Sequence, residues 1–299
     1  MSISIVGSVA FDTLHSPEGT KEKILGGSAV YAAIAASYFT FPAVIGVVGE
    51  DFHAEKLELL QARNIDILDI QNKSGKTFHW TGSYLEDINS AKTVSTEIGV
   101  LGDFHPILNE KNAERKILFL ANNDPTAQLE AVLQSNSEWI AMDTMNLWIT
   151  LKREEVIRVA QKVQFLFIND AELRMLANHY NLIQAAKAVF EEVPSLKYLI
   201  LKRGEHGASL FTKDDYFTIG AFPLELVKDP TGAGDSFAGS FLGHLADKEI
   251  TMESLKEALL LGTVTSSFTV EEFGPERLLE ISREQIESRK EQLIKYLSV

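Results

Sequence analysis

A run of small and acidic residues from Asp229 to Asp235 holds the clearest chemistry in this sequence. It reads Asp-Pro-Thr-Gly-Ala-Gly-Asp, and a run typical of a helix, Ser236 to Lys248, follows it. Gly232 and Gly234 let the backbone turn sharply and approach a ligand closely, because neither carries a Cβ. The helix start presents unpaired N–H groups and the positive end of the helix dipole, so the turn is a predicted anion site.

Asp235 lies in this turn, where a carboxylate beside a bound phosphate is unfavourable unless it accepts a proton. An anion site with a built-in base is what phosphoryl transfer to a hydroxyl group requires. We therefore predict Asp235 as the general base, with the backbone N–H groups of Gly232, Ala233 and Gly234 holding the phosphoryl oxygens. Taken alone, Asp235 also fits a simple N-cap of the helix that starts at Ser236.

Four segments, in this order along the chain, resemble the ribokinase-like (PfkB) family of sugar and nucleoside kinases. They are Gly26-Gly27-Ser28, Asn169-Asp170-Ala171-Glu172, Lys202-Arg203-Gly204-Glu205-His206-Gly207 and the 229–235 turn. The resemblance covers essentially the whole chain. It implies a Mg²⁺-dependent kinase that moves the γ-phosphate of ATP to a hydroxyl group, in this family commonly a hydroxymethyl group.

On the ATP side, the resemblance assigns Asn169 to the phosphates and Glu172 to a hydrated Mg²⁺. Their i, i+3 spacing puts both on one helical face, and Mg²⁺ prefers oxygen ligands while keeping several waters. The same residues also fit a helix start with Asn169 as cap and Glu172 as capping-box partner. Lys202 could reach a phosphate, or its turn could be a hairpin with solvated charges. The resemblance gives the remaining ATP contacts as Gly204, Gly207 and Thr231.

On the acceptor side, the resemblance places Asp12 on substrate hydroxyls and the Gly26-Gly27 pair where the backbone approaches the sugar. Sugar kinases of the family commonly continue Gly-Gly-x-x-x-Asn, but Tyr31 stands at the Asn position here. An aromatic side chain could stack on a ring or base, or it could simply pack within a helix. Asn122 follows a predicted strand and is a candidate pocket residue. Other candidates at strand ends are Asn123, Asp124, Asp143, Asn146 and Trp148.

Two further expectations come from the resemblance. Asp229, with Thr231 and residues 268–274, is a candidate K⁺ site. Phe78 and Trp80 alternate along a predicted lid strand and so share one face, where they could stack on a nucleobase or on the apolar face of a sugar. They could equally pack the lid on the body or bury a homodimer contact through the lid. We expect a small sugar as acceptor, with an adenosine-type nucleoside as the alternative and a non-catalytic sensor as a third reading.

Strand-like and helix-like segments alternate around these motifs, which predicts βαβ units and a three-layer α/β/α sandwich with a mainly parallel sheet. The predicted strands are 3–9, 43–49, 116–121, 139–143, 165–168 and 197–202. The predicted helices are 28–39, 51–63, 125–134, 153–162, 170–178, 183–192, 236–248, 252–272 and 283–297. Ser28 is a plausible N-cap of the first helix.

Two segments, 12–25 and 76–100, interrupt the alternation with short extended stretches that have one polar face. The strands expected in the second segment are 77–85 and 93–100, joined by a turn at residues 87–90. The resemblance implies that the two segments form a small β-sheet lid over the sugar, whereas the residues alone also fit ordinary surface hairpins. With no repeats or linker, residues 1–299 are expected to form one kinase domain.

Composition excludes several classes of protein. The net charge of −14 argues against a nucleic-acid partner or an anionic membrane, because phosphate groups require clustered Lys and Arg. The chain has no cysteine, which excludes disulfides, Cys-ligated zinc and thiol catalysis. There is no basic leader before the first apolar run and no apolar stretch of about 18 residues, so we expect a cytoplasmic protein. Neither a Walker motif nor a Gly-x-Gly-x-x-Gly motif occurs.

Overall fold

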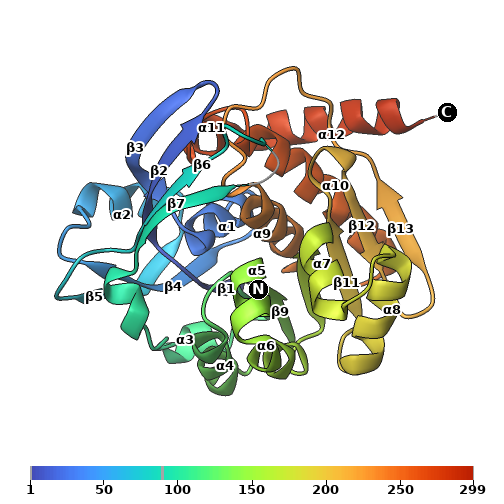
Figure 1. Ribbon diagram of the computed structural model, residues 1–299, viewed down its shortest axis with the longest axis horizontal. Helices are drawn as coiled ribbons and strands as arrows, with labels where there is room; N and C mark the ends of the chain where they lie inside the picture. The colour runs from blue at the N-terminus through green and yellow to red at the C-terminus, as the bar shows by residue number, and fades with distance from the viewer. Residues whose placement is uncertain (1, 89–90, 299) are drawn as a thin grey trace.

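The computed structural model describes residues 2–88 and 91–298, and within them nine strands form a central sheet (Figure 1). Seven neighbouring strands run parallel, and two antiparallel strands extend one edge. In spatial order the strands are β13 (Tyr216–Ile219), β12 (Ala208–Phe211), β11 (Tyr198–Lys202), β10 (Phe165–Asn169), β9 (Trp139–Asp143), β8 (Ile117–Leu120), β1 (Ile3–Val6), β4 (Pro42–Gly49) and β5 (Asp66–Lys73). The predicted mainly parallel sheet is confirmed.

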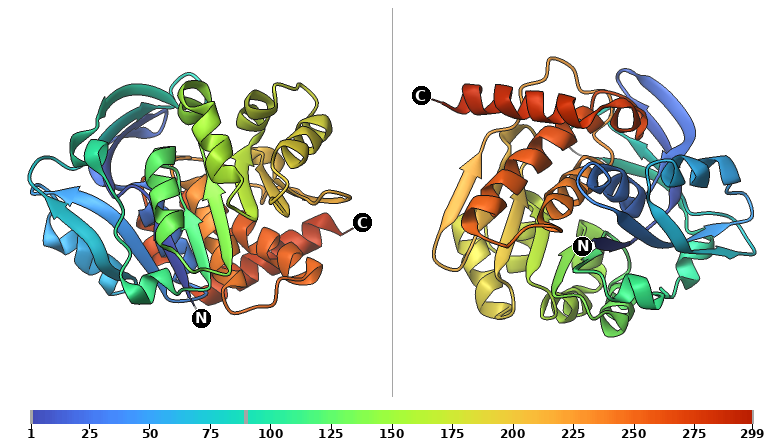
Figure 2. Two further views of the ribbon diagram at one scale, coloured as in Figure 1. Left: turned by 90° about the horizontal axis from the view of Figure 1, so that it is seen from below. Right: turned by 180° about the vertical axis from the view of Figure 1, so that it is seen from behind.

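Helices cover both faces of this sheet, and each face has its own buried hydrophobic cluster. The first face carries α1 (Ser28–Ala36), α2 (Ala54–Gln61), α9 (Ala233–Leu245), α10 (Met252–Thr269), α11 (Glu276–Glu280) and α12 (Arg283–Leu297). The second carries α4 (Pro125–Gln134), α5 (Asn146–Leu151), α6 (Arg153–Ala160), α7 (Asp170–Ala177) and α8 (Leu182–Glu192). Figure 2 shows the orange and red helices on one side and the green and yellow helices on the other. The three-layer prediction is confirmed.

The central strands are buried because helices cover both faces of the sheet. Every residue of β1, β4 and β8 is buried, as expected for parallel strands that have helices on both faces. The short α3 (Glu110–Ala113) contacts β1, where the Ser4 hydroxyl donates to the Asn112 carbonyl at 2.7 Å. Two 3₁₀ turns, η1 (Gly99–Asp103) and η2 (Gly204–His206), complete the described elements.

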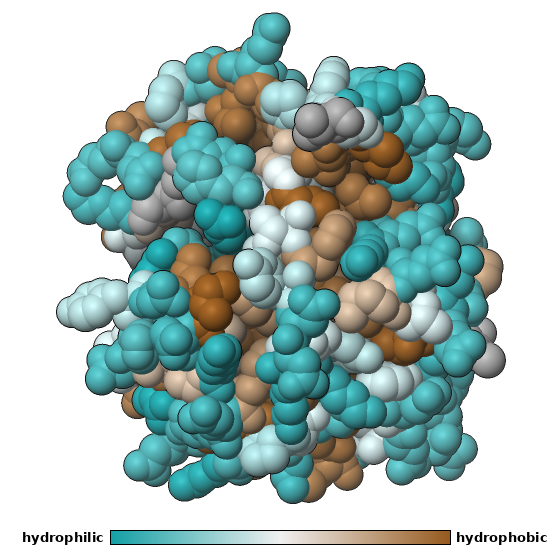
Figure 3. All heavy atoms as spheres, turned by 90° about the vertical axis from the view of Figure 1, so that its right-hand side faces the viewer, coloured by the Kyte–Doolittle hydropathy of each residue, from teal (hydrophilic) through white to brown (hydrophobic). Residues whose placement is uncertain are grey.

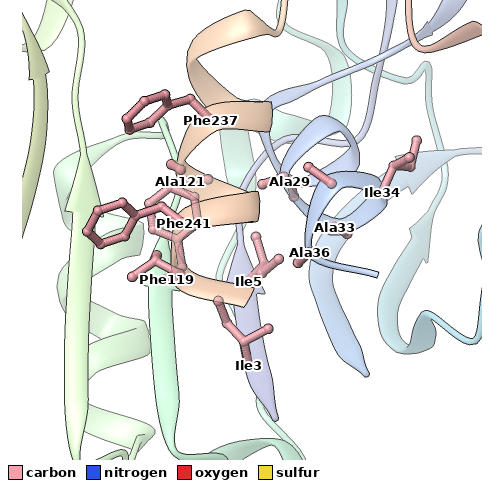
Figure 4. Close-up of a cluster of buried hydrophobic side chains, with 14 of the residues drawn as sticks. Ile3, Ile5, Ala29, Ala33, Ile34, Ala36, Phe119, Ala121, Phe237 and Phe241 are labelled. Atoms are coloured by element: carbon pink, nitrogen blue, oxygen red, sulfur yellow. The ribbon is translucent and has the colours of Figure 1, made fainter. Parts of the chain in front are cut away.

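Close contact between α1 and α9 sets the position of the predicted anion turn. Figure 4 shows α9 beside α1, with the rings of Phe237 and Phe241 on the side of α9 that faces away from α1. A Cβ at Gly239 would lie 2.1 Å from the Ala32 carbonyl oxygen, and one at Gly243 would lie 2.9 Å from the Ala36 Cα. Small residues therefore let the two helix backbones touch, and the start of α9 is held by this packing.

A second sheet combines the two segments that interrupt the alternation. Its order is β3 (Gly19–Gly26), β2 (Ala10–Ser16), β6 (His79–Ser83) and β7 (Lys92–Glu97), with β2 and β6 parallel. The segments thus form one sheet and not two separate surface hairpins. The strands are shorter than predicted, residues 99–103 form η1, and the expected turn at 87–90 lies partly outside the described residues. All six residues of β7 are exposed, and a homodimer contact there stays a prediction.

Several predicted elements end about three residues too late, such as the strand predicted at 3–9 and the helices predicted at 28–39 and 252–272. Three predicted helix starts were wrong for local reasons. Ser28 is not the N-cap of α1; Gly27 is, with φ 101°, and a Cβ there would lie 2.4 Å from the Ser8 carbonyl oxygen. Ser28 is the first helical residue, and its hydroxyl donates instead to the Asn122 carbonyl at 2.9 Å. The helix predicted from residue 51 begins at Ala54, and that predicted from residue 236 begins at Ala233.

The face of the molecule that carries β13 and α8 presents mostly polar side chains (Figure 3). Figure 3 shows the side that carries β13 and α8 as mostly hydrophilic, with hydrophobic side chains in separate small patches. Within residues 2–88 and 91–298, no helix combines the length and apolarity needed to cross a bilayer.

Candidate active site

A cavity of about 1040 Å³ lies where the lid faces the carboxyl ends of the parallel strands. Its wall combines lid residues, the loops after β1, β8 and β9, and the start of α9. Of the residues assigned in the sequence to catalysis, acceptor binding or ATP binding, seven line it: Asp12, Gly27, Tyr31, Asn122, Thr231, Gly232 and Asp235. The structure therefore brings together most of the predicted acceptor side and the predicted base.

The turn before α9 is fixed from both ends by Asp229. One carboxylate oxygen accepts the N–H of Thr231 at 2.9 Å, and the other accepts the N–H of Gly274 at 2.9 Å. Gly232 is the N-cap of α9 with φ 75°, a conformation that glycine adopts without strain. A Cβ at this position would also lie 2.3 Å from the Tyr31 ring. The turn is therefore rigid and requires glycine at Gly232.

Asp235 lies in the first turn of α9 and points into the cavity wall. Burial, together with the Asp143 carboxylate and against the lowering effect of Lys202, raises the pKa of Asp235 to about 8. A carboxyl group with a pKa near neutrality is suited to accept a proton from a substrate hydroxyl. It is not the N-cap, since Gly232 has that place and no side chain caps this helix.

Asp12 leaves β2 toward the same cavity and is 4% exposed. Its carboxylate accepts the N–H of Gly27, and a Cβ at Gly26 would lie 2.0 Å from the nearer carboxylate oxygen. The glycine pair therefore makes room for this side chain. Burial, with a smaller contribution from Asp229, raises the pKa of Asp12 to about 7.

The predicted ATP residues lie beside this cavity, at the ends of β10 and β11. The Asn169 side chain accepts the Glu172 N–H at 2.8 Å, and Glu172 accepts the Asn169 N–H at 2.9 Å. This reciprocal pair is a capping box, one of the two readings left open by the sequence. It occupies one Glu172 oxygen, so contact with a hydrated Mg²⁺ stays a prediction. Burial raises the pKa of Glu172 to about 7, against the lowering effect of Lys202.

Lys202 connects the ATP residues to the turn. Its ammonium donates to Asp143 at 2.5 Å, and a Cβ at Gly234 would lie 3.0 Å from Lys202 Nζ. Burial lowers the pKa of Lys202, but the Asp143 and Glu172 carboxylates outweigh burial and raise it, so the side chain is a cation beside the turn. Residues 203–207 join the antiparallel β11 and β12, which matches the hairpin reading; nucleotide contact by Gly204 and Gly207 stays a prediction.

Residues 2–281 match the family described as pfkB family carbohydrate kinase. The chain belongs to this family. It is 28% identical over 251 residues to a cytidine kinase of Thermococcus kodakarensis, an alignment that covers 81% of this chain and 87% of the relative. It is accordingly a kinase that acts on a carbohydrate or a nucleoside.

Solved structures of the same fold support this assignment of architecture. A Burkholderia thailandensis nucleoside kinase in complex with inosine superimposes with a TM-score of 0.80 at 19% identity, covering 98% of each chain. A putative ribokinase II of E. coli in complex with ATP and Mg²⁺ also has a TM-score of 0.80, at 18% identity, covering 97% of this chain and 99% of that chain.

Some residues of this PfkB-family kinase site could not be found from the sequence. Tyr84, just after the lid strand β6, brings its hydroxyl within 3.0 Å of the Thr231 hydroxyl. These residues are 147 positions apart, and no local pattern marks the contact. The part of the cavity wall formed by Leu101 to His105 was also missed. The strand before it was predicted to end at residue 100, whereas β7 ends at Glu97.

Proposed function

We propose that this PfkB-family kinase transfers the γ-phosphate of ATP to the hydroxymethyl group of a nucleoside. The sequence alone favoured a small sugar as acceptor. The acceptor cavity is the observation that favours a nucleoside instead. At about 1040 Å³ it has the size of sites that hold drug-sized ligands, which exceeds the need of a monosaccharide. Its aromatic wall, which suits a planar base, consists of Tyr31, Phe78, Trp80 and Trp148.

The charge of the wall favours an uncharged acceptor. Among the described residues that line the cavity there is no Lys or Arg. Five carboxylic side chains line it: Asp12, Asp103, Asp124, Glu130 and Asp235. A sugar phosphate would find no described Lys or Arg in this wall to bind it, since Lys152, which pairs with Asp124, lies outside the wall. The hydroxyl groups of a nucleoside can instead donate to carboxylates. The names of two similar proteins, a cytidine kinase and a nucleoside kinase bound to inosine, point the same way.

Two buried polar groups in the cavity wall have no hydrogen-bond partner among residues 2–88 and 91–298. They are the Tyr31 hydroxyl and the Asn123 side-chain N–H₂, on residues that are 1% and 7% exposed. Buried polar groups are normally hydrogen-bonded, so a ligand hydroxyl or carbonyl is the expected partner. We assign Asp12, Tyr31 and Asn123 to the polar face of the acceptor. Gly26 leaves room for the Asp12 carboxylate, and the backbone of Gly26 and Gly27 lies close to this side chain.

The catalytic assignment follows from the turn. Asp235 accepts the proton of the attacking hydroxyl, and the N–H groups of Gly232, Ala233 and Gly234 hold the transferring phosphoryl group. Lys202, a cation beside Gly234, is placed to neutralise phosphate charge on the ATP side. Asn169 and Thr231 complete the ATP side of the proposal, with lid segments 12–25 and 76–100 closing one domain over the acceptor.

The residues present fit Mg²⁺ carried by ATP. In the described part of the chain, no group of three or more His, Asp or Glu side chains forms a metal cage. Glu172 offers one carboxylate next to the predicted phosphate position, which suits a metal that keeps several waters. Mg²⁺ supplies charge neutralisation on the phosphates. Both carboxylate oxygens of Asp229 accept backbone N–H groups. A role of Asp229 in a K⁺ site remains a proposal.

An acceptor screen tests the function directly. The purified protein is incubated with ATP and Mg²⁺, with and without K⁺, and ADP release is measured for nucleosides, free pentoses, free hexoses and sugar phosphates. We expect turnover with at least one nucleoside and little with free sugars. Turnover confined to a free sugar would restore the carbohydrate reading. If none of the acceptor classes led to ADP release, kinase activity of either kind would be contradicted.

A further inference from the structure

We propose that Trp148 is the stacking platform for the nucleobase of the acceptor, held in place by Asn122 and Lys152. This inference rests on the proposed nucleoside kinase function. Trp148 lies on α5, after the end of β9, and lines the acceptor cavity. The sequence singled out both Asn122 and Trp148 as candidates without connecting them.

The contacts of Asn122 show that its side chain is used within the protein. Its side-chain oxygen accepts the indole N–H of Trp148 at 3.1 Å, and its side-chain N–H₂ group contacts the Met145 sulfur at 3.1 Å. Both polar ends are therefore occupied, in contrast to the free N–H₂ group of Asn123. Asn122 is accordingly a positioning residue that fixes the Trp148 ring, and Asn123 takes over direct contact with the ligand.

Lys152 contacts the same ring without lining the cavity. Its ammonium lies 5.7 Å from the centroid of the Trp148 ring, within the range of a cation–π contact, and donates to Asp124 at 2.6 Å. Trp148 and Asp124 line the cavity, whereas Lys152 is not one of its wall residues. With the indole N–H satisfied by Asn122, the part of Trp148 that remains for a ligand is its apolar ring surface.

The other indole in the cavity is less suited to this role. The Trp80 ring covers Gly82 of its own strand, where a Cβ would lie 2.1 Å from the ring, and its N–H donates to Thr93 at 3.1 Å. Trp80 also packs against the small lid cluster of Leu14, Tyr84 and Phe273. One surface of Trp80 is thus used to build the lid, so the lid aromatics close over a base that rests on Trp148.

The surroundings of Trp148 favour a flat, uncharged ring system. Apolar and sulfur-containing side chains lie around it in the wall: Met145, Leu147, Leu151 and Met175. Stacking of a base on an aromatic ring is sequence-tolerant, because every base has a π-face. The platform therefore predicts that the kinase accepts more than one nucleoside and loses affinity when the base is removed.

Replacement of Trp148 by Leu and by Phe tests the platform. Stacking energies of bases on aromatic rings predict that Trp148→Leu raises the KM for nucleosides about 10-fold or more, with kcat changed less than about 3-fold. Trp148→Phe should recover most of the affinity. The matched control is Trp139→Phe, because Trp139 meets Phe165 edge-to-face, makes a cation–π contact with Lys197 and does not line the acceptor cavity. An unchanged nucleoside KM in Trp148→Leu would overturn the platform.

A fluorescence measurement keeps the test valid if Trp148→Leu folds poorly. The chain has three tryptophans, so the double variant Trp80→Phe/Trp139→Phe leaves Trp148 as the only one. Its emission should be quenched by a nucleoside and not by free ribose. If this double variant itself turns over nucleosides but its emission does not change, only the platform fails. If the wild type turns over no nucleoside, the proposed function fails, and the platform with it.

Discussion

At the scale of single residues, the buried carboxyl groups of this kinase differ in what surrounds them. Asp229 binds two backbone N–H groups and so acts as a structural anchor. Asp12 and Asp235 line the cavity, and burial raises their pKa values to about 7 and about 8. Two groups that release protons only near neutral pH are therefore placed where a substrate hydroxyl would be activated.

The Glu172 residue offers a test that separates metal binding from helix capping. Glu172→Gln keeps an N3 side chain that can complete the capping box, so the thermal midpoint should change by less than a few degrees. If Glu172 holds hydrated Mg²⁺, the Mg²⁺ concentration for half-maximal activity should rise about 5-fold or more. Titration of activity with Mg²⁺ measures this, and an unchanged titration curve would leave capping as the only role of Glu172.

The sequence predicted single residues well where a motif is local. Gly232 and Asp235 are three positions apart on one turn, and their placement at the start of α9 follows from that spacing. The contact between Tyr84 and Thr231 and that between Asn122 and Trp148 join separate loops of the fold. Such contacts depend on how the lid and strand ends meet, and no local pattern records them.

At the scale of elements, the contact of α1 with α9 sets the position of the anion turn. Gly239→Ala would place a Cβ 2.1 Å from the backbone carbonyl of Ala32, which cannot move without displacing α1. Overpacking of this kind costs about 1–3 kcal/mol and should also lower kcat, because α9 carries Asp235 at its start. Denaturant unfolding and initial rates measure the two effects.

The matched control for the helix contact is Gly220→Ala. A Cβ at Gly220 meets only the Leu297 side chain, at 3.6 Å, and its φ lies outside the left-handed region. We expect nearly unchanged stability and rate for this variant. If Gly239→Ala behaved in the same way, the helices would be less closely coupled than the structure indicates.

The lid is coupled to the turn through one hydroxyl pair. Tyr84→Phe removes the contact with Thr231 at 3.0 Å while keeping the ring in the lid cluster. Loss of a single hydrogen bond of about 1 kcal/mol predicts a nucleoside KM raised about 3- to 10-fold. Steady-state kinetics test this, with Tyr216→Phe on the exposed β13 as control. Equal KM values for the wild type and Tyr84→Phe would show that this pair does not hold the lid.

Element prediction succeeded where hydrophobic periodicity was strong. The bounds of α4, β9 and α12 were predicted to the residue, because each begins or ends at a clear polar or Pro signal. The edge strands β5 and β13 were missed, since their residues are mostly polar and only partly buried. The strand pairing that turns two segments into one lid, β2 with β6, depends on tertiary contacts.

At the scale of the whole molecule, the site carries a cost in stability that depends on pH. The pKa of Asp235 is about 8 in the fold against an ordinary value of 3.8, so the folded state binds this proton more tightly than the unfolded state does. The contribution of this group to the free energy of unfolding is therefore largest at low pH and falls as pH rises toward 8. A variant without this carboxyl should not show that fall.

Thermal unfolding of Asp235→Asn and wild type across pH measures this cost. Below about pH 4 the midpoints of the two proteins should be closest, because the carboxyl is then protonated in both the folded and the unfolded wild type. Toward pH 8 and above, the variant should become the more stable protein, since it buries no charge. A difference in midpoint that stays constant with pH would mean that Asp235 does not titrate as its burial indicates.

The central claim, that Asp235 is the base of a kinase that phosphorylates an alcohol, is tested most directly by the turnover of Asp235→Asn. We expect kcat to fall by about 10²- to 10⁴-fold, because a positioned base is lost. The dissociation constants for ATP and for the acceptor should stay within a few-fold of wild type, because the amide keeps the shape of the side chain. Turnover near the wild-type rate, with binding intact, would contradict the claim.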